Sequence, residues 1–261
     1  MTTIDLNCDM GEREDLASSA QESLMQYITS ASLACGAHAS DEALMRLTLR
    51  QALAHCGANR VTIGAHPGYP DRLNFGRLEM VIPIADLEAS IEGQVRGLAS
   101  LADEEGVEVR YVKPHGALYN RAAWDLELAR AIARAVFRVG RDLAIVGLAG
   151  SPALAVWREA GIRTVAEAFA DRRYEADGSL RARRHDDALV RNPEDAARQA
   201  LRIAIRHEVV ACDGSVVKVE AETLCIHSDT PGAVDIARSV RKRLEDAGVK
   251  VGTWHSEPAL G

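Results

Sequence analysis

Short runs of apolar and β-branched residues alternate along the chain with longer amphipathic segments. Seven of the short runs have the composition and length of strands: Thr3–Asp9, Ser30–Gly36, Val61–Ala65, Val109–Lys113, Ala144–Ala149, Arg163–Phe169 and Thr223–His227. The longer segments predict helices over residues 41–56, 86–105, 125–138, 152–160, 193–206 and 232–247. In residues 86–105 the apolar side chains of Leu87, Ile91, Val95 and Leu98 recur every three or four positions, so they share one helical face.

This alternation of strands and helices with short connections predicts an α/β protein with a parallel sheet covered by helices. Seven or eight such units predict a closed or nearly closed (β/α) barrel, and an open doubly wound sheet is the alternative. No Gly-x-Gly-x-x-Gly motif opens the first unit, so a dinucleotide-binding fold gains no support. We expect one domain over residues 1–261, with a small hairpin in Val209–Val219 and a long polar loop over residues 170–191.

Composition narrows the class of protein. Hydrophobic residues make up 47% of the 261 residues and charged residues 26%, which is typical of a globular protein with a sizeable core. The net charge of −7 argues against general affinity for nucleic acid or for an anionic membrane. The first residues have no signal-peptide pattern and no run of about eighteen apolar residues occurs, so we expect a cytoplasmic protein without a membrane span. Five cysteines without a Cys-x-x-Cys pair predict neither disulfides nor a structural zinc site.

Titratable residues follow the predicted strands at their carboxyl ends. They are Asp9 and Glu12 with the first strand, His38 after the second, His66 after the third, Lys113 and His115 with the fourth, Glu167 and Asp171 with the sixth, and His227 and Asp229 with the seventh. In a (β/α) barrel these ends converge on one mouth, the usual place for an active site. A single strand-end histidine is more often a hydrogen-bonded structural residue than a catalyst, and Asp229 before Thr230-Pro231 fits a helix cap equally well. Their coincidence at strand ends predicts a shared catalytic site.

The remaining histidines fall in helical or loop contexts, where we expect surface or structural roles: His55, His185, His207 and His255.

The residue types at the strand ends allow two kinds of chemistry. Asp9, His66 and His115 offer the ligands of a mononuclear divalent-metal site, although no His-Glu-x-x-His spacing supports it. Without a metal, Lys113 together with Asp9, Glu12 and the histidines can polarise an amide and activate water or a phosphate. The residues alone leave both open. No P-loop motif occurs, so nucleotide binding does not follow from a motif.

Several longer motifs span the chain in order. The most specific is Lys-Pro-His-Gly-Ala-Leu-Tyr-Asn at 113–120, and others are Ile-Asp-Leu-Asn-Cys-Asp-Met-Gly-Glu at 4–12, Ile-Gly-Ala-His-Pro-Gly-Tyr-Pro-Asp at 63–71, Glu-Ala-Phe-Ala-Asp-Arg at 167–172 and Ile-His-Ser-Asp-Thr-Pro-Gly at 226–232. In these motifs the chain resembles the family of 5-oxoprolinase A subunits, formerly called lactam utilisation proteins. The resemblance implies a (β/α)7 barrel related to the barrels of glycoside hydrolases and polysaccharide deacetylases.

The resemblance also implies an activity: hydrolysis of the lactam of 5-oxo-L-proline to L-glutamate, coupled to conversion of ATP to ADP and phosphate. It implies a complex with subunits B and C, and ATP as co-substrate. A divalent metal, including Mg²⁺ bound with ATP, is compatible with this activity, and so is a homo-oligomer. Two rival functions are a stand-alone metal-dependent deacetylase or amidase of the same barrel superfamily, and a non-catalytic component that hands substrate to partner subunits.

Overall fold

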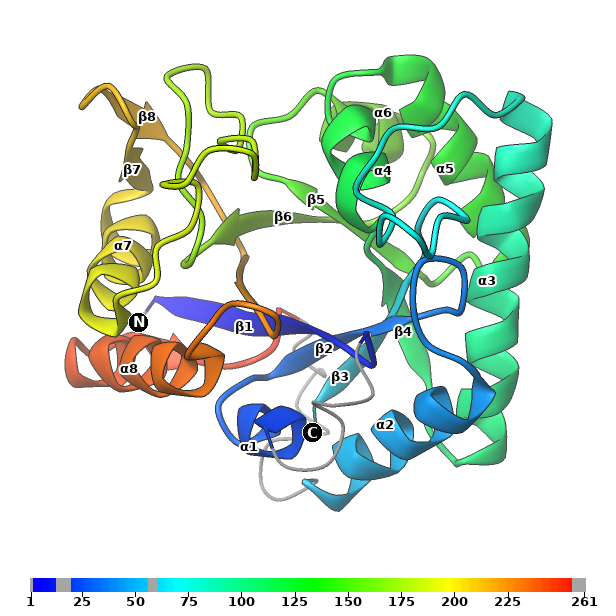
Figure 1. Cartoon of the computed structure of the whole chain (residues 1–261), viewed down its shortest axis with the longest axis horizontal. Helices are drawn as coiled ribbons and strands as arrows, with labels where there is room; N and C mark the ends of the chain where they lie inside the picture. Colours follow the sequence, from blue (N-terminus) through cyan, green and yellow to red (C-terminus); the bar gives the residue numbers. More distant parts are fainter. Residues whose placement is uncertain (1, 13–19, 56–60, 255–261) are drawn as a thin grey trace, which may run out of the picture.

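The computed structural model describes residues 2–12, 20–55 and 61–254. Seven parallel strands surround its centre: β1 (Thr3–Met10), β2 (Ser30–Ala34), β3 (Thr62–His66), β4 (Val109–Val112), β5 (Ala144–Leu148), β6 (Thr164–Phe169) and β9 (Thr223–His227) (Figure 1). The strand β9 pairs with β6 on one side and with β1 on the other, which closes the sheet. The prediction of a (β/α)7 barrel is therefore confirmed, and the open doubly wound alternative is wrong.

Helices cover the outside of the barrel. They are α1 (Ala20–Met25), α2 (Glu42–Ala54), α3 (Ile84–Glu104), α4 (Gly116–Ala122), α5 (Leu126–Val139), α6 (Ala153–Glu159), α7 (Pro193–Arg206) and α8 (Ala233–Asp246). All six predicted helices are present, although residue 56 of the first lies outside the described residues. The pattern missed α1 and α4, which are too short to show a helical period. No helix in the described part of the chain is long and apolar enough to cross a membrane.

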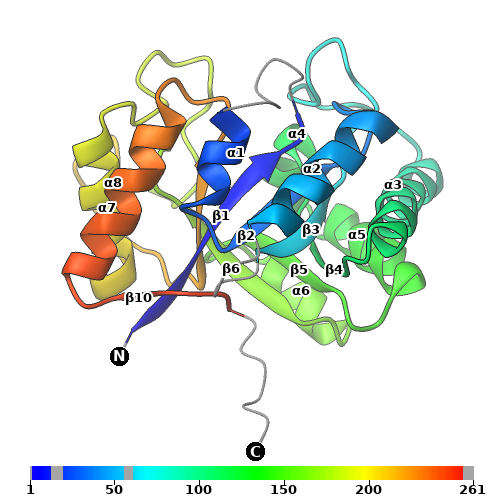
Figure 2. The ribbon, with the colours of Figure 1, turned by 90° about the horizontal axis from the view of Figure 1, so that it is seen from below.

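The predicted hairpin is confirmed as two antiparallel strands, β7 (Glu208–Val210) and β8 (Val216–Lys218). A last short strand, β10 (Lys250–Val251), pairs with the start of β1. In side view β10 crosses below the barrel, at the end opposite to the loops that follow the other strands (Figure 2). The long polar loop at 170–191 lies at the loop end and is held by two isolated bridges, Arg172 to Leu189 and Tyr174 to Leu180.

The interior of the barrel is polar along β1 because residues two apart on a strand share a face. Asp5, Asn7 and Asp9 form one such row, while the alternate residues join the apolar core. The Asp5 carboxylate accepts hydrogen bonds from Ser30 Oγ at 2.7 Å and from Thr29 Oγ1 at 2.6 Å. The row of polar groups thus begins at the closed end of the barrel and leads to the mouth.

The described cysteines are Cys8, Cys35, Cys212 and Cys225, and all four are free thiols. The fifth, Cys56, lies outside the described residues.

Close packing between β3 and β4 makes Gly64 a sensitive position. A Cβ atom there would lie 2.2 Å from the Tyr111 ring, whose hydroxyl is 3.1 Å from Ser32 Oγ. We expect Gly64→Ala to lower the free energy of unfolding by about 1–3 kcal/mol through overpacking, as measured by urea denaturation. Gly93→Ala is the matched control, because Gly93 is exposed on α3 with nothing within 4 Å of its Cβ position. Equal effects of the two changes would contradict this packing.

Candidate active site

Residues from most of the strands meet at the carboxyl-end mouth of the barrel. Six of the ten predicted site residues line one cavity of about 440 Å³: Asp9, Glu12, His66, Lys113, His115 and His227. Three more, His38, Glu167 and Asp171, are bonded to members of this set from below or beside it. Only Asp229 lies apart from the buried group.

The Lys113 ammonium group is the electrostatic centre of the mouth. Its Nζ lies 2.8 Å from Asp9 Oδ1 and 2.7 Å from Glu167 Oε1, and it donates to Asn7 Oδ1 at 3.0 Å. Burial would lower the pKa of Lys113, but Asp9 and other neighbouring groups hold this pKa well above its usual value. The ammonium group thus lies among these three oxygens and the Cys225 Sγ atom, which accepts a hydrogen bond from it at 3.2 Å. This geometry favours a role in holding Asp9 and Glu167 in place over direct contact with a substrate.

Asp9 is kept ionised by its surroundings. Burial alone would raise the pKa of its carboxyl group, but His66 and Lys113 together bring the pKa well below the usual value. Its Oδ2 atom lies 3.4 Å from His66 Nε2. Asp9 is thus a fixed negative charge between the ammonium group and the histidines.

Glu12 joins the histidines at the mouth. Its Oε1 atom lies 3.0 Å from His115 Nδ1 and 3.2 Å from His38 Nε2. The His38 ring stacks on the His115 ring with centroids 3.8 Å apart. Burial lowers the pKa of His38 to about 4, so this imidazole is neutral and donates its Nε2 proton to the carboxylate. Its other ring nitrogen is buried without a partner among the described residues.

Two backbone carbonyls determine the tautomers of His66 and His115. His66 Nδ1 lies 2.7 Å from the Lys113 carbonyl oxygen, and His115 Nε2 lies 2.9 Å from that of Phe75. A carbonyl oxygen only accepts, so each of these nitrogens carries a proton. The remaining nitrogens, His66 Nε2 and His115 Nδ1, face each other at 2.9 Å. Two bare lone pairs repel at that distance, so the geometry requires a proton or a cation between them.

The electrostatics of His66 agree with this requirement. Burial would lower the pKa of His66, but the carboxylates of Asp9 and Glu12 raise it above the usual value. The ligand atoms of Glu12, His38, His66 and His115 all lie within 4.8 Å of one another. Asp9, predicted as a ligand beside His66 and His115, belongs instead to a second group with Cys225 and His227.

On the other side of the mouth, Asp171 orients His227. The Asp171 carboxylate lies 3.0 Å from His227 Nδ1 and accepts from Thr230 Oγ1 at 2.7 Å. Burial would raise the pKa of Asp171, but His227 outweighs it and lowers the pKa to about 2. With Nδ1 bound to the carboxylate, Nε2 of His227 is the nitrogen left to exchange a proton with a ligand in the cavity.

Two glycines let the loops approach the imidazoles. A Cβ atom on Gly68 would lie 2.7 Å from His38 Nδ1, and one on Gly76 would lie 2.9 Å from His38 Cβ. Gly76 also has a φ of 62°, in the left-handed region that favours glycine. A side chain at either position would therefore collide with His38, so glycine at both positions allows His38 to stack on His115.

Asp229 has a different environment from the one predicted. It forms ion pairs at the rim with Arg77 and, at 3.6 Å, with Arg183. Nor does it cap a helix, because α8 begins after Gly232 without a side-chain cap.

The sequence pattern did not predict Asn7 as a site residue, although its place two residues before Asp9 on a strand was a usable signal. The Phe75 carbonyl and the Cys225 thiol also belong to the site, and the thiol lies 3.2 Å from Lys113 Nζ. No feature of the sequence predicts either of them.

The described histidines outside the site are His55, His185 and His207, and none lines the cavity. His55 bonds to the Gln51 carbonyl oxygen and His207 ends α7 in a left-handed conformation. His255 lies outside the described residues.

A closed (β/α) barrel with buried titratable groups at its carboxyl-end mouth defines a class of protein, the (β/α)-barrel enzymes. More particularly, the chain belongs to the LamB/YcsF family, whose model matches residues 4–258. Relatives that are named as 5-oxoprolinase A subunits confirm the resemblance to that family.

Similar proteins cover the chain almost completely. The 5-oxoprolinase A subunit of Chloroflexus aggregans is 47% identical over 254 residues, which are 97% of this chain and 99% of that protein. The protein of the same name from Neisseria meningitidis serogroup A is 44% identical over 251 residues, 96% of this chain and 99% of the relative. Among solved structures, a lactam utilization protein from Thermus thermophilus matches with a TM-score of 0.88 and 41% identity, covering 97% of this chain and 100% of that one.

Proposed function

We propose that the chain is a subunit of an ATP-dependent 5-oxoprolinase, which hydrolyses the lactam of 5-oxo-L-proline to L-glutamate while ATP becomes ADP and phosphate. The observation that carries the proposal is the charge-compensated cluster around Lys113 and Glu12, which opens on a cavity of about 440 Å³. That volume suits a small molecule. Relatives that align over nearly the whole chain are named as 5-oxoprolinase A subunits.

The chemistry explains the need for ATP. A five-membered lactam is a stabilised amide, and phosphorylation of its oxygen makes the ring carbon open to attack. One water adds to that carbon, the carbon–nitrogen bond breaks and the nitrogen takes up a proton. A second water releases phosphate from the resulting acyl phosphate and leaves the carboxylate. The proposed site of these steps is the cavity above Asp9.

Two groups of the cavity are suited to move the protons. We assign His227, oriented by Asp171, as the base that takes a proton from water. We assign the His66–His115 pair, with Glu12, as the source of the proton for the leaving nitrogen. Lys113 and Glu167 are positioning residues in this scheme, and His38 supports Glu12.

Partners are part of the proposal. The relatives are named as one subunit of an enzyme, which implies an assembly, and we propose 5-oxoprolinase subunits B and C as the partners that bind ATP and complete the reaction. The free thiols and the use of ATP fit a reducing compartment, and we propose the cytoplasm.

The residues of the mouth also fit a divalent cation. Its ligands would be His66 Nε2 and His115 Nδ1, whose lone pairs face each other, with the Glu12 carboxylate and His38 close by. Both imidazoles already donate their other proton to a backbone carbonyl, the arrangement that usually orients metal-binding histidines. When bound, such an ion lowers the pKa of a water and polarises a carbonyl oxygen.

Activity of the complex tests the proposed function. We expect Asp9→Asn and His115→Gln to lower glutamate release from 5-oxoproline and ATP by about 100-fold or more, because they remove the buried charge and the proton carrier of the site. His55→Gln, at the far end of α2, is the matched control and should leave the rate unchanged. The measurement is glutamate release by the chain reconstituted with subunits B and C, with circular dichroism to show that the variants fold.

Two results would contradict the proposal. Full activity of the Asp9 and His115 variants would show that these residues are not part of the catalytic site. Amide hydrolysis by the chain alone, without ATP, would favour the deacetylase or amidase alternative.

Elemental analysis tests the cation separately from activity. We expect the chain, dialysed after exposure to zinc or manganese, to retain about one ion, and the His66→Gln variant to lose it because one facing lone pair is gone. His55→Gln should retain the ion. Equal metal content in all three proteins, or none in the unmodified chain, would contradict the cation site. A shared proton would then be what lies between His66 Nε2 and His115 Nδ1.

A further inference from the structure

Arg172 is a buried cation without a carboxylate partner among the described residues. The residue is only 4% exposed and directly follows Asp171 in the loop after β6. Within the described part of the chain its guanidinium donates one hydrogen bond, from Nη2 to the Arg181 carbonyl oxygen at 2.7 Å, and its Nε is buried without a partner. The neighbouring Asp171 carboxylate is already bound to His227 and Thr230.

An unpaired buried charge is costly, so its persistence needs a cause. Burial lowers the pKa of Arg172 to about 10, with a further contribution from Arg183, while the Asp171 carboxylate acts in the opposite direction; the guanidinium stays charged at neutral pH. Arg172 lines the same cavity as Asp9 and His227. The missing counter-charge is therefore expected from a ligand in that cavity.

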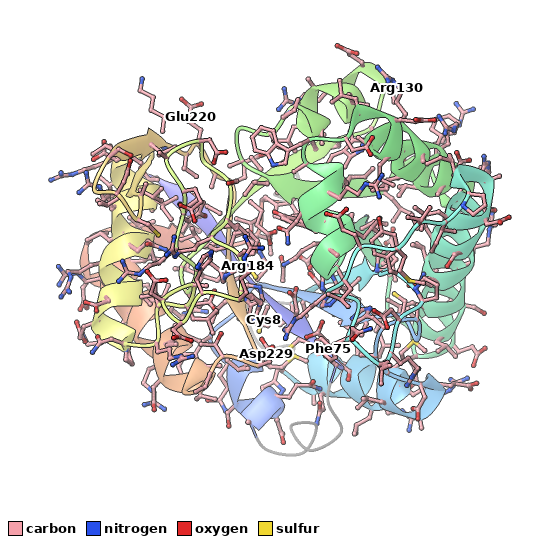
Figure 3. The ribbon with its side chains drawn as sticks, turned by 45° about the horizontal axis from the view of Figure 1, so that its top comes forward. Cys8, Phe75, Arg130, Arg184, Glu220 and Asp229 are labelled. Atoms are coloured by element: carbon pink, nitrogen blue, oxygen red, sulfur yellow. The ribbon has the colours of Figure 1, made fainter. Side chains whose placement is uncertain are left out.

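The surroundings of Arg172 add to the positive charge at the rim. Arg77, Arg183 and Arg184 also line the cavity, and the first two share the single carboxylate of Asp229. Figure 3 shows Arg184 and Asp229 near the centre of the molecule, where the loops meet over the barrel. The carboxylates of Asp9, Glu12 and Glu79 line the cavity as well. Lys113 already compensates the charge of Asp9, so the arginines leave room for a further negative charge in the cavity.

We propose that Arg172 anchors the carboxylate of the lactam substrate and so makes the enzyme specific for a lactam that carries one. This inference rests on the proposed function. One planar guanidinium with free N–H groups matches one carboxylate and binds it in a fixed orientation. 5-Oxoproline has that carboxylate at one end and the lactam at the other. Binding at Arg172 turns the lactam toward Asp9, Glu12 and His66, where the proton-transfer groups lie.

The test compares two lactams that differ in the carboxylate. For Arg172→Gln in the reconstituted complex, we expect KM for 5-oxoproline to rise about 10- to 100-fold, the effect of losing a hydrogen bond to a charged group. The kinetic constants for 2-pyrrolidinone, which lacks the carboxylate, should stay unchanged. For Arg172→Lys, KM for 5-oxoproline should lie between the values of the unmodified complex and of Arg172→Gln, because lysine keeps the charge and loses the planar fork.

Two controls separate recognition from folding. Arg110→Gln removes an arginine that pairs with Glu108 away from the cavity and should change neither KM. The melting temperature of Arg172→Gln should be equal to or above that of the unmodified chain, because the change removes a buried charge that forms no ion pair with a carboxylate among the described residues. A lower melting temperature with equal losses for both lactams would show a structural role and overturn the proposal.

Other outcomes are equally decisive. An unchanged KM for 5-oxoproline in Arg172→Gln overturns the proposal, as does a raised KM for ATP alone, which would assign Arg172 to a phosphoryl group.

If the unmodified complex releases no glutamate, the proposed function fails. Calorimetric titration of the full chain with 5-oxoproline and with 2-pyrrolidinone then decides on Arg172: tighter binding of 5-oxoproline that Arg172→Gln abolishes supports the anchor, and any other result overturns it.

Discussion

The buried ammonium group of Lys113 is the constraint on which the mouth of the barrel depends. Asp9 comes from β1 and Glu167 from β6, and both carboxylates lie within 2.8 Å of Lys113 Nζ. Without this cation two negative groups would be buried side by side in the barrel. The same residue orients His66 through its backbone carbonyl oxygen. One position after β4 therefore sets both the charge balance and the tautomer of His66.

From this centre the site divides into two proton-transfer groups and a rim. His66, His115 and Glu12 share a proton or a cation on one side, and Asp171 holds His227 on the other. The arginines of the rim line the same cavity. A substrate with one anionic end and one amide end fits that division of charge. The fold contributes by bringing residues that are more than a hundred positions apart into contact inside the barrel, although their strands are not neighbours in the sheet.

The sequence predicted the barrel and most of the cavity lining for a physical reason. Strand and helix periods are local, and parallel strands place their carboxyl ends together, so strand-end residues such as Asp9 and His66 could be predicted to meet. Contacts between side chains are not local. The pairing of Asp229 with Arg77, the grouping of Glu12 with the imidazoles and the isolation of Arg172 depend on loop conformations that no period encodes. The groups that surround Lys113 Nζ likewise come from separate strands, and no local pattern could predict that they meet.

A double-mutant cycle on Lys113 and Glu167 tests this account most directly. Lys113→Met should lower the free energy of unfolding by about 3–5 kcal/mol, because it leaves two carboxylates buried without their counter-charge. Adding Glu167→Gln should return at least about 1 kcal/mol of that loss, since one of the stranded charges is removed. Urea denaturation of the four proteins measures the coupling. Losses that simply add would show that Lys113 does not hold the mouth together through its charge, and would contradict the account.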